Sequence, residues 1–262
     1  MPDKIITSIP IRIRVTVVML LKATLMYRPT MACLHWIGQR SWRPRALHFY
    51  SQFVTQGSLC FDIGANIGDR INIFRKLGAA VIAVEPQDDC IRRLRKAYSN
   101  DCDVKIVQKA VGPHEGSVII HRNAAANGLS SCSPEWIKAV KSTGRFGGLA
   151  WDRNVEVPMT TLDTLITEFG SPDFCKIDVE GYEQEVIRGL SQPVKAISLE
   201  FTPEYLISAI NSVHRLAGLG LTKFNYTVDE SMKWALPNWV GENEICTILA
   251  NEKLAGDIYG TI

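Results

Sequence analysis

The stretch that decides the predicted fold runs from Ser58 to Gly68 and reads Ser-Leu-Cys-Phe-Asp-Ile-Gly-Ala-Asn-Ile-Gly. It begins as an apolar strand that ends at Asp62, and Gly64 and Gly68 then bracket a tight turn into a helix. Such a turn needs glycine because a Cβ would block the backbone angles and the close approach of a ligand. Glu85 ends the next predicted strand, where its carboxylate can accept two hydrogen bonds from a ribose diol. Turn, helix, strand and acid in this order predict a nucleotide-binding βαβ unit.

The same turn indicates the kind of nucleotide. The fingerprint for nicotinamide dinucleotides has its first two glycines two positions apart and holds a pyrophosphate over the helix N-terminus. Here Asn66 stands at the second of these positions, and Asp62 before the turn would repel a pyrophosphate. S-Adenosyl-L-methionine has no phosphate and carries a cationic amine and a cationic sulfonium, which suit a carboxylate. The residues favour S-adenosylmethionine over a nicotinamide cofactor.

Strand and helix patterns alternate after residue 56, which predicts a mostly parallel sheet covered on both faces. Parallel strands are expected at 58–63, 79–84, 104–107, 174–178 and 196–201. Two late strands, 222–228 and 245–250, have no long helix between them and predict an antiparallel C-terminal edge. The predicted fold is therefore α/β, a doubly wound seven-stranded sheet of the Rossmann-like kind.

Two segments lie outside this alternation. Residues 122–151 are rich in Gly, Ser, Asn and Ala and are expected to form a lid or binding loop, in which Trp136 and Trp151 are candidates to stack on an acceptor. Residues 1–50 are predicted to be a basic helical extension, and residues 51–262 the catalytic domain.

Composition and charge exclude several classes of protein. With 46% apolar and 21% charged residues, the chain is neither disordered nor a polytopic membrane protein. The net charge of +2 is unevenly placed: residues 1–56 hold eight lysines and arginines against one acid, or +7, which leaves −5 for the rest. The basic end predicts an anionic partner or a peripheral contact with a membrane. Within residues 11–28, the most apolar part of this end, the longest uncharged run is 15–21, far shorter than the ~20 residues that cross a bilayer.

The seven cysteines include no CxxC pair, which speaks against structural zinc. Three of them, Cys60, Cys175 and Cys246, lie in apolar, strand-like runs. We therefore expect reduced, buried thiols in a reducing compartment, and a cytoplasmic location.

A second group of acids lies at Asp173-Phe-Cys-Lys-Ile-Asp-Val-Glu-Gly-Tyr-Glu183. The strand delivers Asp178 and Glu180 to its carboxyl end, which is where doubly wound folds bind ligands. An alcohol is a poor nucleophile and needs a base, for which Glu180 is the first choice and Glu200 the second. Alternatively, Asp178, Glu180 and Glu200 together would chelate a hard divalent ion that orients a diol. The sequence leaves both possibilities open.

These motifs resemble the FkbM family of methyltransferases. The resemblance covers roughly residues 50–260 and is carried, in the order of the family, by FDIGANIGD at 61–69, VEP at 84–86, KAVG at 109–112, TLDTL at 161–165 and KIDVEGYEQEVIRGL at 176–190. It implies a class I fold that depends on S-adenosylmethionine and often methylates hydroxyls of sugars or natural products.

By this resemblance the methionine part of the cofactor lies at the glycine turn, the ribose at Glu85, the adenine near 109–111 and the transfer site at Asp178. The cofactor-binding residues it implies are Asp62, Gly64, Ala65, Asn66, Gly68, Glu85, Pro86, Ala110 and Asp178.

The predicted function is O-methylation of a sugar, glycan or natural product by S-adenosylmethionine. Two alternatives stay open: a cofactor-binding module without turnover, and a methyltransferase that acts on nitrogen or on nucleic acid. A nucleic-acid partner is not expected, because no basic stretch is interleaved with aromatic residues.

Overall fold

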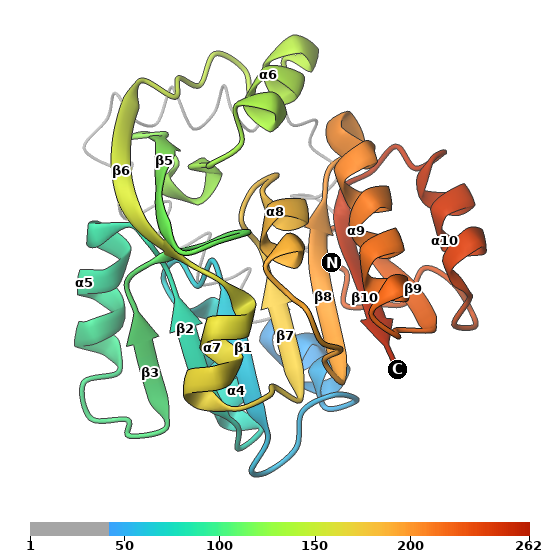
Figure 1. Ribbon diagram of the computed structural model, residues 1–262, viewed down its shortest axis with the longest axis horizontal. Coiled ribbons are helices and arrows are strands. Elements are labelled where there is room, and N and C mark those ends of the chain that lie inside the picture. Colours follow the sequence, from blue (N-terminus) through green and yellow to red (C-terminus); the bar gives the residue numbers. More distant parts are fainter. Residues whose placement is uncertain (1–41) are drawn as a thin grey trace.

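A seven-stranded sheet forms the centre of the computed structural model, which describes residues 42–262 (Figure 1). The strand order is β3-β2-β1-β7-β8-β10-β9, and β10 runs antiparallel to both β8 and β9 while the other pairs are parallel. The predicted fold class is thereby confirmed. The strands are β1 (Leu59–Ile63), β2 (Ala80–Val84), β3 (Val104–Val107), β7 (Phe174–Ile177), β8 (Ala196–Phe201), β9 (Lys223–Val228) and β10 (Gly256–Thr261).

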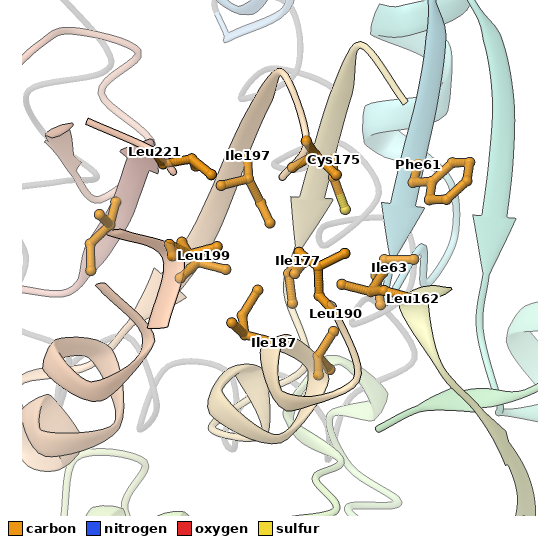
Figure 2. Close-up of a cluster of buried hydrophobic side chains, with 14 of the residues drawn as sticks. Phe61, Ile63, Leu162, Cys175, Ile177, Ile187, Leu190, Ile197, Leu199 and Leu221 are labelled. Atoms are coloured by element: carbon orange, nitrogen blue, oxygen red, sulfur yellow. The ribbon is translucent and has the colours of Figure 1, made fainter. Parts of the chain in front are cut away.

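One face of the sheet packs against helices from the second half of the chain. Apolar side chains that alternate along β1, β7 and β8, such as Phe61, Ile177 and Leu199, meet this helical layer and form the largest hydrophobic cluster (Figure 2). Its helices are α7 (Leu162–Phe169), α8 (Glu183–Arg188), α9 (Leu206–Gly218) and α10 (Glu242–Leu249).

The opposite face is covered by α4 (Asp69–Lys76), α5 (Asp88–Ala97) and a helix whose described part spans residues 42–50. Trp42, Phe49 and Tyr50 of this N-terminal helix are buried in a second core that also contains Phe174 and Tyr259 of the sheet. This helix is therefore built into the core of the domain. The expectations for residues 1–41, including their contact with a membrane, lie outside the described residues.

A small second layer lies above the carboxyl ends of the parallel strands, at the top of Figure 1. It contains a three-stranded sheet in the order β4-β6-β5 and the helix α6, and the short helix η1 precedes α6. We call this layer, residues 110–160, the cap. Its elements are β4 (Ala110–Val111), β5 (Gly116–Arg122), η1 (Asn127–Leu129), α6 (Pro134–Thr143) and β6 (Arg153–Thr160).

Two local predictions were wrong. Residues 245–250 belong to α10 and not to a strand, because Ile245 and Leu249, four residues apart, are buried against the core as a helix requires. The last strand is β10 instead. Residues 122–151 are also more ordered than the predicted loop: the Ser133 hydroxyl caps α6 by accepting from the Trp136 amide, and Gly144 ends the helix with a φ of 66°.

Within residues 42–262, no helix has the length and apolarity to span a membrane. The six cysteines of this part of the chain are all free thiols.

Candidate active site

The carboxyl ends of β1, β2, β7 and β8 open into a pocket of about 330 Å³ beneath the cap. The strand ends contribute Gly64, Glu85, Asp178 and Glu200 to its wall, and the cap contributes Asn127 to Ser130 from above. In doubly wound folds this edge of the sheet is where ligands bind, because the loops there are free of the helical layers.

The turn after β1 brings two loops of the site into direct contact. Gly64 has a φ of 84°, and a Cβ at this position would overlap the carbonyl oxygen of Asp178. The amides of Gly64 and Ala65 both donate to the carbonyl of Val84 at the end of β2. Glycine at 64 therefore allows three strand ends to converge on one pocket.

Glu85 is almost fully buried at the end of β2, and both its carboxylate oxygens already hold the backbone. Its Oε2 accepts from the Asn66 amide and its Oε1 from the Gln87 amide, each at 2.9 Å. Burial raises the pKa of Glu85, while these two amides oppose the rise. A carboxylate offers about four acceptor sites and Glu85 lines the pocket, so it has the capacity to receive the two hydroxyls of a ribose as well.

Asp62 lies on the sheet face opposite α7–α10, beside Lys176 in the register of β1 and β7. Its side chain is buried, its Oδ2 has no hydrogen-bond partner, and burial raises its pKa to about 7. An unpaired buried carboxylate of this kind is stabilised by a cationic ligand.

Three carboxylates meet on the pocket wall where β7 and β8 end. The side chains of Asp178, Glu180 and Glu200 place oxygens within 4.8 Å of one another. Burial raises the pKa of Glu180, and the nearby charge of Asp178 adds to the rise. Burial, followed by the charges of Glu180 and Asp178, raises the pKa of Glu200 in the same way. Carboxylates this close disfavour one another's ionisation, so the three groups titrate together and the protonated forms of Glu180 and Glu200 are favoured.

Lys176 decides which member of this triad stays ionised. Its ammonium is fully buried and lies 2.8 Å from Asp257 Oδ1 and 3.2 Å from Asp178 Oδ2, and it also donates to the carbonyl of Ile177. Burial tends to raise the pKa of Asp178, but the charges of Lys176 and Arg70, together with hydrogen bonds from Lys176 and Glu200, outweigh it, so the pKa is lowered. Asp178 is therefore the fixed negative charge of the triad.

The backbone at Glu180 is held in an unusual conformation. Glu180 has a φ of 54°, which is rare for a residue with a side chain, and its carbonyl accepts from the Ser131 hydroxyl at 2.6 Å. The next residue, Gly181, has a φ of 87°, and an added Cβ there would overlap the Trp136 ring. The cap and the loop after β7 thus fix each other's positions.

Of the residues predicted to bind the cofactor, six line the pocket and three support it from behind. The lining residues are Gly64, Asn66, Glu85, Pro86, Ala110 and Asp178, and they are joined by the predicted catalytic residues Glu180 and Glu200. Asp62, Ala65 and Gly68 are not on the wall. The expected stacking role of Trp136 is excluded, because this side chain is fully buried and donates to the Thr202 hydroxyl. Trp151 is partly buried and donates from its indole nitrogen to the carbonyl of Leu129 in the cap.

Sequence reasoning missed the two residues that set the charge of the triad. Lys176 and Asp257 lie in the middle of strands, and Asp257 belongs to β10, which the sequence did not reveal. A lysine between two buried apolar residues, Cys175 and Ile177, was the available signal, since lysine is almost never fully buried without a partner.

The fold and the pocket together define an α/β protein that binds a nucleoside-containing ligand at the switch point of its sheet. The model of the methyltransferase FkbM domain family matches residues 62–215, which is more than half of the chain. The chain belongs to this family of methyltransferases, as the sequence motifs predicted.

Among solved structures, the chain is similar to a precorrin-6Y C5,15-methyltransferase of Geobacter metallireducens, with 13% identity, a TM-score of 0.40, and coverage of 83% of this chain and 86% of the other. It is also similar to the C-terminal domain of the same enzyme of Rhodobacter capsulatus, with 13% identity, a TM-score of 0.41, and 84% and 89% coverage. Fibrillarin of Aeropyrum pernix, solved with S-adenosyl-L-methionine, has 9% identity, a TM-score of 0.41, and 80% and 68% coverage. A comparison with curated proteins gives no match.

The residues of the pocket fit S-adenosyl-L-methionine, the methyl donor that the family implies. Glu85 lines the pocket and can accept from the ribose hydroxyls, and Gly64 and Asn66 line the same wall at the glycine turn. Asp62 lies behind this wall, where its buried carboxylate, with Oδ2 unpartnered, adds a negative charge that suits the cationic end. Ala110 and Val111 line the same pocket beside Pro86, where the resemblance places the adenine.

Proposed function

We propose that this protein transfers a methyl group from S-adenosyl-L-methionine to a hydroxyl group of a sugar, a glycan or a similar natural product. The observation that carries the proposal is the triad of Asp178, Glu180 and Glu200 on the wall of the cofactor pocket. Carboxylates that retain a proton in the free protein are groups that can exchange one with an acceptor hydroxyl. A nitrogen acceptor has a nucleophilic lone pair of its own and needs no such group.

A second cavity, of about 180 Å³, supports a polar acceptor. It adjoins the cofactor pocket, because Asp178, Glu200 and Glu230 line both. The rest of its wall is Arg145 with Asp229, Asp257 and two small residues, so carboxylates and one guanidinium dominate it. Such a lining suits a ligand rich in hydroxyl groups and offers little to an apolar one.

Methyl transfer to a hydroxyl is an in-line displacement in which one O–C bond forms and one S–C bond breaks. S-Adenosylmethionine supplies the methyl group and leaves as the neutral thioether. The task of the protein is to align the hydroxyl, to exclude water and to receive the hydroxyl proton. The cap closes the pocket from above, and the wall shared by the two cavities is where an acceptor oxygen meets the triad.

The proton goes to a carboxylate of the triad. Asp178 is the weakest base of the three because Lys176 lowers its pKa, so its negative charge serves to orient and not to accept. Glu180 and Glu200 have raised pKa values and are the stronger bases once the positive charge of the bound S-adenosylmethionine has favoured release of a proton from the triad to water. Glu180, our first choice from the sequence, keeps that place, and Glu200 is the second.

A divalent ion on the same three carboxylates is the rival arrangement. Their oxygens lie close enough to share one ion. However, the Lys176 ammonium already occupies an oxygen of Asp178 at 3.2 Å, which favours the arrangement without a metal.

The proposal is tested by incubating the protein with S-adenosylmethionine that carries a deuterated methyl group and with panels of sugars, glycans, peptides and RNA. We expect the label in an ether on a sugar or other hydroxylated acceptor, detected by mass spectrometry. Glu180→Gln is expected to lower kcat by about 10²- to 10⁴-fold, the usual contribution of a positioned base. Glu185→Gln, an acid of α8 paired with Arg188 away from the pocket, is the matched control and should retain activity.

Label found only on nitrogen or on RNA would contradict O-methylation. Binding of S-adenosylhomocysteine without transfer to any acceptor would favour a module without turnover. Treatment with a chelator distinguishes the two arrangements of the triad: full activity without metal agrees with the base, whereas loss that Mg²⁺ restores would replace it with an ion.

A further inference from the structure

The amino-acid end of S-adenosylmethionine bears a carboxylate as well as an ammonium, and the predicted site residues at the glycine turn account only for the ammonium. Asp178 and Glu230 on the wall at this end of the pocket, and the buried Asp62 behind it, are all acids. A bound α-carboxylate requires a cation or several hydrogen-bond donors.

Three largely buried cations lie near these acids in the described part of the chain. Arg145, on the wall of the second cavity, is paired with Glu204. Of the other two, Lys176 is fully engaged. The Lys176 ammonium has three donors, which face Asp257, Asp178 and the carbonyl of Ile177. Arg70, the second residue of α4, uses only its Nη2 to bond Glu230, at 2.8 and 3.0 Å, while its Nε is buried without a partner. Arg70 thus has donor capacity that the free protein leaves unused.

Arg70 is held in place by the N-terminal helix. Its guanidinium carbon lies 4.6 Å from the centre of the Trp42 ring, and the Trp42 indole nitrogen donates to Glu230 Oε2 at 2.8 Å. Trp42 therefore contacts both partners of the ion pair. Only 12% of the Arg70 side chain is exposed, and Glu230 lines both cavities.

We infer that Arg70 and Glu230, clamped by Trp42, form the subsite for the amino-acid end of S-adenosylmethionine. The inference rests on the proposed function. An arginine–glutamate pair is complementary to a zwitterion, because the guanidinium fork receives the α-carboxylate and the glutamate, with Asp62, receives the α-ammonium. Trp42 and Glu230 lie outside residues 62–215, so this subsite is built partly by segments beyond the family match.

The test compares two ligands that differ in this end alone. S-Adenosylhomocysteine has the amino-acid end, whereas 5′-methylthioadenosine keeps the adenosine and the thioether and lacks it. We expect Arg70→Met to weaken S-adenosylhomocysteine by about tenfold or more in calorimetry, the loss typical of hydrogen bonds to a charged group, and to change methylthioadenosine by less than about twofold. Trp42→Phe, which keeps a ring and removes the donor to Glu230, should show the same selectivity at a smaller magnitude.

Retained binding of methylthioadenosine shows that a variant is folded, and Arg70→Lys provides a milder change that keeps the charge. Arg75→Met is the matched control, because Arg75 lies on the same helix and forms ion pairs with Asp101 and Asp103 away from the pocket. It should leave the affinity for both ligands unchanged.

Equal losses for the two ligands would overturn the inference and make the cluster a purely structural tie of the N-terminal helix. Unchanged affinity of Arg70→Met for S-adenosylhomocysteine would overturn it as well. A wild-type protein that binds neither ligand would instead contradict the proposed function, so the two failures are distinguishable.

Discussion

The carboxylate of Glu85 has two roles: it accepts hydrogen bonds from the backbone, and it is proposed to bind the ribose of the ligand. Its two oxygens accept from the amides of Asn66 and Gln87, which ties the turn after β1 to the loop after β2. We expect Glu85→Ala to weaken S-adenosylhomocysteine by roughly 10- to 100-fold in calorimetry, because the ribose and the loop lose hydrogen bonds to a charged group.

Asp88→Ala is the matched control for this prediction. Asp88 begins α5 three residues after Glu85, bonds the exposed Gln108 and does not line the cofactor pocket. Its loss should leave the affinity unchanged. An unchanged affinity for Glu85→Ala would instead place the ribose elsewhere.

Site residues were predictable from the sequence where a residue suited to ligand binding directly follows an apolar strand. Gly64, Glu85 and Asp178 each stand at the end of an apolar strand, so the rule that parallel strands end at one edge was enough to bring them together. Lys176 and Glu230 were not predictable in this way, because their roles depend on partners that are distant in the chain, Asp257 and Arg70.

At the scale of elements, the close packing of the cap on the loop after β7 requires a glycine at 181, beside the hydrogen bond from Ser131 to Glu180. Gly181 has a positive φ, and a Cβ there would meet the fully buried Trp136. We expect Gly181→Ala to lower the free energy of unfolding by about 3 kcal/mol, because it combines a strained backbone with overpacking of a core that cannot yield. Urea denaturation measures the change.

Gly218→Ala provides the comparison. Gly218 ends α9, has open space where a Cβ would lie, and shows no positive φ. Alanine at this position should be neutral or stabilising by up to about 1 kcal/mol, since it restricts the unfolded chain and favours the helix. Equal effects of the two substitutions would show that the cap does not depend on Gly181.

The elements that sequence analysis misassigned share a physical cause. The run 245–250 is apolar enough for a buried strand, and only tertiary packing of Ile245 and Leu249 against the core makes it a helix. The strand β6 escaped notice because its first half, residues 153–156, is exposed and mostly polar. This half is stabilised by pairing with β5 and not by a buried apolar face. Parallel strands that are buried on both sides were easier to find, since their apolar runs are continuous.

The whole molecule carries a dense set of buried acids, and this predicts how its stability depends on pH. Burial raises the pKa of both Asp62 and Glu183 to about 7. In the unfolded chain these groups titrate near their ordinary values, so between about pH 4 and 7 the folded state binds more protons than the unfolded state. The free energy of unfolding of the ligand-free protein should therefore fall as the pH rises from 5.5 to 7.5.

Groups with lowered pKa values do not mask this trend. Asp178, Asp101 and Asp173 contribute stability that is present above their unfolded pKa and is lost only as the pH falls through lower values. That loss lies below the window from 5.5 to 7.5. Between pH 5.5 and 7.5 Asp62 and Glu183 each account for a fall of about 2 kcal/mol at most. Other buried acids with raised pKa values, such as Glu85 and Asp257, act in the same direction, and urea denaturation at several pH values measures the total.

A cationic ligand should reverse the trend at one of these two groups. S-Adenosylmethionine favours the ionised form of Asp62, so the rise in melting temperature that it produces should grow between pH 5.5 and 7.5. In Asp62→Asn this growth should disappear, while the pH dependence of the ligand-free protein keeps the share of Glu183, which accepts from the amides of Val179 and Gly181. If the ligand-induced rise in melting temperature grew with pH as much in Asp62→Asn as in the wild type, the titrating group would be another carboxylate of the site. The substitution removes the ionisation of Asp62 and leaves the other carboxylates in place, so it isolates the contribution of Asp62 to ligand binding.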